Sequence, residues 1–197
     1  MRNSVLVRLF LFTFSLFVLV NCSSIKIQTG ETPEEKNEST QEQARQFKIR
    51  WSADFERATE LKKVELLLAH LQRMENWYQQ LGDTLANRWR EGNTGRGEPI
   101  SSDEINRLVD NSLQPHQPML TAWDEMIEYG VKRIGELKYF APDVLDRIDA
   151  VVDQFYKFSS VVRYPSGEYA DYDQKTRMEA QNFDAQLTDL QNWLKSQ

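Results

Sequence analysis

Apolar side chains recur along most of this chain at steps of three or four residues, the spacing of one face of an α-helix. The longest such stretch runs from about Gln41 to Trp89 and contains no proline and a single glycine, Gly82. It predicts one long first helix, which we expect Gly82 and Asp83 to bend or divide. Its apolar face consists of Phe47, Trp51, Phe55, Ala58, Leu61, Val64, Leu68, Leu71, Met74, Tyr78, Leu81 and Leu85.

Shorter helical patterns follow the first one. Ser101 is suited to cap a helix, and Glu104 three residues later completes a capping box ahead of an apolar stripe that ends at Leu113. Pro142 sits at a first-turn position, where proline is favoured. The remaining patterns cover residues 119–137, 144–162 and about 170–195. No stretch alternates for long enough to predict a strand.

The fold class predicted by these patterns is all-α, an antiparallel four-helix bundle with a long first helix and a flexible N-terminal tether. The tether follows from residues 23–43, where Ile25 and Ile27 are almost the only large apolar side chains. Such a stretch cannot bury enough surface to order itself. We therefore expect a signal peptide over residues 1–21, a lipidated cysteine and disordered tether over 22–43, and the helical bundle domain over 44–197.

The start of the chain has the layout of an export signal. Arg2 and Arg8 supply positive charge, and residues 9–20 then form an apolar run that is too short to be a spanning helix. The run ends in Leu19-Val20-Asn21-Cys22, which resembles the lipobox of bacterial lipoproteins. The resemblance implies that a diacylglyceryl group is attached to Cys22 and that the chain is cut just before it.

Asn21 departs from the lipobox pattern, because that position is usually Gly, Ala or Ser; some bacterial groups, spirochaetes among them, tolerate a wider choice. A plain membrane anchor with an incidental cysteine is the alternative. Cys22 is the only cysteine in the chain, and it stands where lipidation needs it. Ser23 is not the aspartate that retains such proteins at the inner membrane in some bacteria, so the outer membrane of the bacterial cell envelope is favoured over the inner one.

Charge narrows the choice of partners. Loss of Arg2 and Arg8 with the signal peptide reduces 24 basic residues to 22 against 30 acidic ones, a formal net charge of −8. An acidic domain has no electrostatic reason to bind nucleic acid. The membrane attachment therefore depends on the lipid at Cys22.

No catalytic or metal-binding motif emerges, so we expect neither an enzyme nor a cofactor or metal. His70 and His116 are the only histidines, and neither stands in a Glu-x-x-His or His-Glu-x-x-His pattern. A run of aspartates at three- and four-residue steps could bind a cation but is more typical of a solvated helix face: Asp143, Asp146, Asp149 and Asp153.

Aromatic residues carry the remaining functional signal. Most of the five tryptophans fall on or beside the apolar stripes, where core packing is expected. Tyr164, Tyr169 and Tyr172 surround a Pro-Ser-Gly turn, and tyrosine is enriched at protein interfaces. They are candidates for a partner-binding patch, unless they seal the end of the bundle.

We therefore predict a membrane-anchored lipoprotein whose non-enzymatic helical domain acts by contact with a protein partner. The alternative is a periplasmic bundle that holds a small ligand or cofactor. This alternative requires a cavity between helices, lined by Trp and Met, with His70 nearby.

Overall fold

The computed structural model describes residues 33–94, 100–137 and 142–196. The chain divides into two compact units, Met1–Lys36 and Asn37–Gln197. Of the first unit only residues 33–36 are described, and they are helical. The predicted signal peptide, Cys22 and residues 23–32 of the predicted tether lie outside the described residues.

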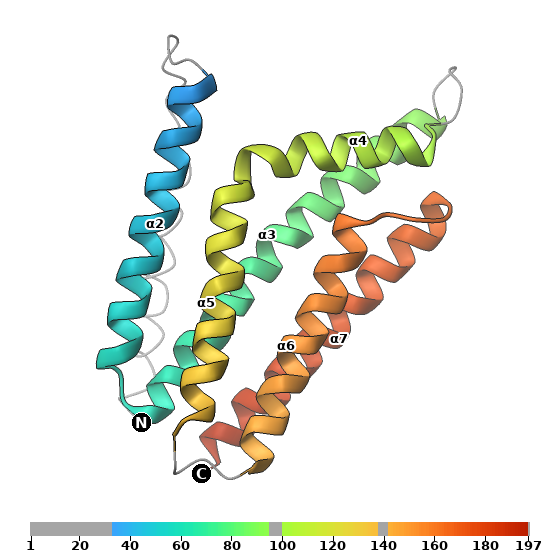
Figure 1. Ribbon diagram of the computed structural model, residues 1–197. Helices are drawn as coiled ribbons and strands as arrows, with labels where there is room; N and C mark the ends of the chain where they lie inside the picture. Colours follow the sequence, from blue (N-terminus) through green and yellow to red (C-terminus); the bar gives the residue numbers. More distant parts are fainter. Residues whose placement is uncertain (1–32, 95–99, 138–141, 197) are drawn as a thin grey trace, which may run out of the picture. The chain divides into compact units, whose positions relative to one another are not determined.

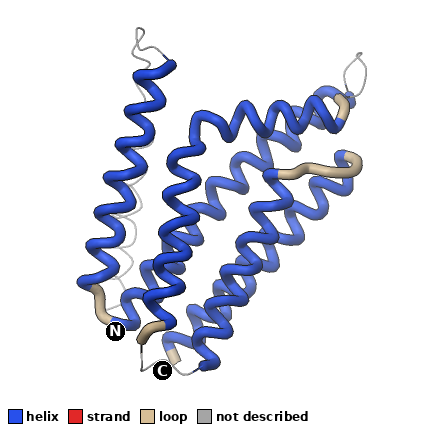
Figure 2. Tube along the Cα trace, viewed as in Figure 1, coloured by secondary structure: helices blue, strands red, loops and turns tan. Residues whose placement is uncertain are grey.

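Every regular element among the described residues is a helix (Figures 1 and 2). The all-α class expected from the apolar spacing is confirmed for this part of the chain. In chain order the elements are α2 (Pro33–Arg57), α3 (Glu60–Thr94), α4 (Ser102–Leu113), the short 3-10 helix η1 (Gln114–His116), α5 (Gln117–Gly135), α6 (Pro142–Arg163) and α7 (Tyr169–Lys195).

The predicted first helix is two helices, and the prediction of where it would divide was wrong. The chain leaves the helical path at Ala58 and Thr59, between α2 and α3, although neither residue is a helix breaker. The ε-amino group of Lys63 donates a hydrogen bond to the carbonyl of Glu56, at 3.2 Å, and so satisfies one of the terminal carbonyls of α2. The apolar spacing continues across the bend because both helices turn that face toward the same core.

Gly82 lies inside α3 and does not interrupt it. A Cβ atom at this position would be 3.2 Å from Thr176 Cγ2 and 3.5 Å from Val162 Cγ2. The glycine therefore allows close approach of α6 and α7 to α3, a use that its sequence context does not reveal.

Helix α2 begins at Pro33, earlier than the expected start near Gln41. Residues 33–43, which the sequence assigned to a disordered tether, are therefore helical. Near the end of this stretch, Glu42 bonds along the helix: both guanidinium contacts of Arg45 to Glu42 measure 2.8 Å, and Gln46 also donates to Glu42. From residue 38 onward, where burial is described, Ala44 is the first buried side chain in this helix.

The start of α4 follows the prediction closely. Ser101 is the N-cap residue, and its hydroxyl accepts a hydrogen bond from the backbone N–H of Glu104 at 3.3 Å. Helix α6 begins at Pro142, also as expected. Both starts depend on local backbone chemistry, which sequence alone specifies well.

The core lies among α3, α5, α6 and α7. Helix α3 contacts the other three, and α6 contacts both α5 and α7. Figure 1 shows α6 and α7 side by side, running in opposite directions, while α4 crosses near one end of α3. The largest fully buried side chains include Tyr78, Tyr172, Phe55, Phe155, Phe158 and Phe183.

Candidate functional site

The three tyrosines of the predicted patch have different environments. Tyr172 is only 1% exposed, and its ring lies 5.6 Å from that of Trp89 in α3. Tyr169 is half-buried and its ring lies 6.4 Å from that of Trp89. Tyr164, in contrast, is 72% exposed. Tyr169 and Tyr172 thus join α7 to α3, and Tyr164 alone of the three is accessible to a partner.

Tyr164 lies at the edge of a surface groove of about 410 Å³, which we call the Tyr164 groove. The groove lies where the end of α6 faces the junction of α4 and α5. Six of the residues that line it have polar side chains and two are leucines: Asp110, Asn111, Leu113, Gln114, Gln117, Leu120, Arg163 and Tyr164.

Arg163 is held in this groove by two other helices. Its Nε donates a hydrogen bond to the hydroxyl of Tyr78 in α3, and its Nη2 lies 3.6 Å from Asp124 Oδ2 in α5. Burial raises the pKa of Tyr78 to about 12, although the nearby Arg163 charge opposes that shift. Tyr78 is therefore a neutral phenol at physiological pH. Asp124 is then the carboxylate that faces the Arg163 charge, while the Tyr78 hydroxyl accepts its hydrogen bond.

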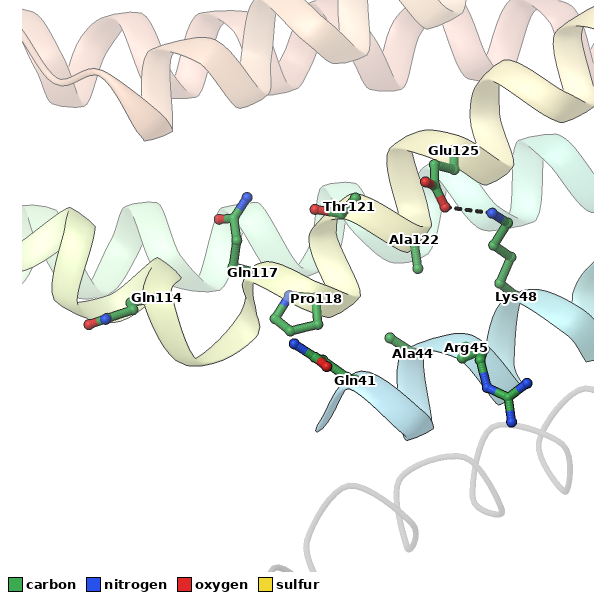
Figure 3. Close-up of a pocket in the computed structure, with 10 residues that line it drawn as sticks. All are labelled: Gln41, Ala44, Arg45, Lys48, Gln114, Gln117, Pro118, Thr121, Ala122 and Glu125. Carbon is green, nitrogen blue, oxygen red and sulfur yellow. Dashed lines mark hydrogen bonds and ion pairs between the residues drawn. The ribbon is translucent and has the colours of Figure 1, made fainter. Parts of the chain in front are cut away.

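A second groove, of about 570 Å³, lies between α2 and α5, and we call it the α2–α5 groove (Figure 3). The ion pair between Lys48 Nζ and Glu125 Oε2, at 2.6 Å, crosses from one helix to the other within it. Gln114 and Gln117 line both grooves. The remaining lining residues are Gln41, Ala44, Arg45, Pro118, Thr121 and Ala122.

His70 belongs to a packed aromatic cluster and lines neither groove. It is 2% exposed, and its Nε2 lies 3.2 Å from the carbonyl oxygen of Trp123. Its ring lies 5.5 Å from that of Trp51 and 6.4 Å from that of Trp123. Burial lowers the pKa of His70 to about 4, so the ring is neutral and Nε2 carries the proton that the carbonyl accepts.

Glu75 is a buried carboxyl that the sequence reading missed. It is 1% exposed, and it accepts a hydrogen bond from Gln72 Nε2 at 2.9 Å. Burial first, and then the negative charge of Asp184 on α7, raise the pKa of Glu75 to about 7. A sequence signal existed, because Glu75 follows Leu71 by four residues and therefore shares its apolar face.

The aspartates of α6 form no cation site. All four side chains, Asp143, Asp146, Asp149 and Asp153, are exposed. Within the described ranges, no three His, Cys, Asp or Glu side chains gather in a way that could hold a metal ion. The run is therefore a solvated helix face in this part of the structure.

Comparison with protein-family models, with curated proteins and with solved structures found no match for this chain. Among the helices that the structure describes, none has an apolar stretch long enough to cross a bilayer.

Proposed function

We propose that this chain is a membrane-anchored bacterial lipoprotein whose helical domain acts by protein–protein contact and not by catalysis. The observation that carries the anchor is the position of Cys22. It is the only cysteine, and it directly follows the export-type apolar run and Asn21. Two acyl chains would hold such a protein stably at a membrane. Ser23 after the cysteine favours the outer membrane over the inner one.

The anchor is tested by metabolic labelling with a palmitate analogue and mass spectrometry of the N-terminal peptide. We expect label on the wild-type chain and none on the Cys22→Ser variant. Protease treatment of intact cells then distinguishes a domain displayed at the cell surface from one that faces the periplasm. An unmodified Cys22 in a processed or unprocessed chain would contradict the anchor.

We further infer that the domain is an antiparallel four-helix bundle of α3, α5, α6 and α7, with α2 and α4 added to it. Two observations support this arrangement. Helix α3 contacts the other three, α6 contacts α5 and α7, and all four contribute buried side chains to one core. Successive members of the set also run in opposite directions in Figure 1.

The proposed contact site is the Tyr164 groove. Tyr164 is an exposed aromatic side chain beside a held guanidinium, Arg163, and tyrosine and arginine are the residues most enriched where proteins bind each other. A photo-crosslinking amino acid at position 164 should capture one defined partner in cells. The same group at Met178, which is also exposed but lies on α7, is the matched control. Equal capture from both positions would argue against a contact site at Tyr164.

The alternative function, a bundle that holds a small ligand or cofactor in the periplasm, is supported by the size of the grooves. Volumes of about 410 and 570 Å³ lie in the range of small-molecule sites. Neither groove is lined by tryptophan, methionine or His70, the residues that this function was expected to use. Native mass spectrometry of the purified protein distinguishes the two functions, because a retained ligand would add a defined mass.

A further inference from the structure

The connection between α2 and α3 is unusual in containing only two residues and no helix breaker. Ala58 has the highest helix propensity of any residue, and Thr59 is only moderately unfavourable. The backbone N–H of Ala58 still bonds to the carbonyl of Phe55 at 3.2 Å, and the carbonyl of Thr59 already accepts from Lys63 at 2.9 Å. The local sequence would therefore permit one continuous helix through the bend.

Tertiary contacts hold α2 in its bent position. The rings of Trp51 and Phe55 stack, with their centres 4.8 Å apart, and lie over Gly130 of α5. A Cβ atom on Gly130 would be 3.2 Å from the Trp51 ring and 3.6 Å from the Phe55 ring. Trp51 also faces His70 of α3 at 5.5 Å, and Phe55 faces Tyr129 of α5 at 6.0 Å. We call the region formed by Leu67, His70, Tyr129 and Gly130 the α2-binding surface.

Ion pairs add specificity along the edge of this surface. Lys48 of α2 bonds to Glu125 of α5 at 2.6 Å, and Arg133 of α5 bonds to both carboxylate oxygens of Glu56, at 2.8 and 3.0 Å. The Lys63 ammonium of α3 lies 5.5 Å from the centre of the Phe55 ring. All these contacts depend on the side chains of α2 and none depends on the two connecting residues.

We propose that the α2-binding surface also accepts α2 from a second copy of this chain, while α2 and α3 of each copy join into one continuous helix through Ala58 and Thr59. The exchanged dimer keeps every contact between α2 and its binding surface. It gains backbone hydrogen bonds at the former ends of the two helices, where carbonyl and N–H groups otherwise lack helical partners. Short hinge connections favour domain swapping.

Inter-chain crosslinking tests the exchange directly. Two differently tagged full-length chains, both carrying Cys22→Ser, are co-expressed, one with Lys48→Cys and the other with Glu125→Cys. A short bis-maleimide should then yield a crosslinked dimer that carries both tags. Replacement of Glu125→Cys by Asp189→Cys, at an exposed position on α7, should reduce this product at least tenfold. A doubly tagged product that is absent, or equally abundant with the α7 cysteine, would overturn the proposal.

A pair of variants at the exposed Thr59 provides an independent measurement. Thr59→Pro stands just before the first turn of α3, where a proline removes no helical hydrogen bond, but it clashes with the carbonyl of Phe55 in a continuous helix. Thr59→Ala favours the continuous helix. By size-exclusion chromatography with light scattering, we expect proline to lower the dimer fraction at least tenfold and alanine to raise it several-fold. Circular dichroism checks that both variants are folded, and unchanged dimer fractions in two folded variants would overturn the proposal.

Discussion

Gly130 of α5 lies directly against the indole of Trp51: a Cβ atom on the glycine would stand 3.2 Å from Trp51 Cη2. The same atom would be 3.1 Å from Leu67 Cδ1, and Leu67 is fully buried in the core. Few real Cβ contacts are this short, so the missing side chain at residue 130 allows Trp51 and Leu67 to lie this close to α5.

Gly130→Ala should destabilise the protein by about 1–2 kcal/mol, because the added methyl group overpacks a core site. Alanine would otherwise stabilise a helix interior by roughly 1 kcal/mol relative to glycine. Chemical denaturation measures the difference. Gly135→Ala in the same helix is the matched control, since nothing lies within 4 Å of its Cβ position. That control should be neutral or stabilising, and a stabilising Gly130→Ala would contradict the packing.

Removal of the N-cap of α4 should weaken the domain. Ser101→Ala leaves the N–H of Glu104 without its side-chain acceptor and should cost about 1 kcal/mol of unfolding free energy. Ser101→Asp restores an acceptor and should recover most of the loss. Equal destabilisation by alanine and aspartate would show that the hydroxyl has another role.

Glu75 should make stability fall as the pH rises. Its pKa is raised from 4.5 in the unfolded chain to about 7 in the fold, chiefly by burial and also by Asp184. The stabilising effect of the protonated carboxyl is therefore complete below about pH 4.5 and is lost as the pH passes through 7. The free energy of unfolding of Glu75→Gln should therefore exceed that of the parent by on the order of 1–3 kcal/mol at pH 8, and by little at pH 4.5.

Denaturation curves collected from pH 4 to pH 9 measure this effect. Glu65→Gln, an exposed position in the same helix, should leave the shape of the pH profile unchanged. If Glu75→Gln and the parent have parallel profiles, the carboxyl does not titrate as its burial implies.

His70 should make the stability of the fold decrease as the pH falls. Burial lowers its pKa from 6.5 to about 4, so the stability that the neutral ring contributes is complete above pH 6.5 and is lost as the pH falls through 4. The midpoint can be followed by the imidazole proton resonances in NMR, with the exposed His116 as a reference signal. A His70 midpoint at or above 6.5 would show that the ring is solvated.

Tyrosine truncations should separate folding from recognition. Tyr172→Ala removes a fully buried ring packed on Trp89 and should cost about 3–5 kcal/mol. Tyr164→Ala should change stability by no more than about 0.5 kcal/mol, because its ring is exposed. Thermal unfolding measures both. Any loss of partner crosslinking in Tyr164→Ala would then report on contact and not on folding.

The sequence by itself determined the helical class, the Ser101 cap, the start of α6 at Pro142 and most of the core. These features follow from apolar spacing and from backbone chemistry within a few residues, and both can be read along the chain. Cys22 and its lipid are likewise a sequence-level prediction, because they lie outside the described residues and depend on a short linear motif.

Only the tertiary structure decided where the first helix bends, which glycines admit a neighbouring helix, and which tyrosine stays accessible. No helix breaker stands at Ala58 or Thr59, and Trp51 and Phe55, just before the bend, lie against Gly130 of α5. The two grooves likewise combine residues from α2, the α4–α5 junction and the end of α6. Contacts between such distant segments leave no periodic signal, because periodicity records which face of a helix is buried and not what buries it.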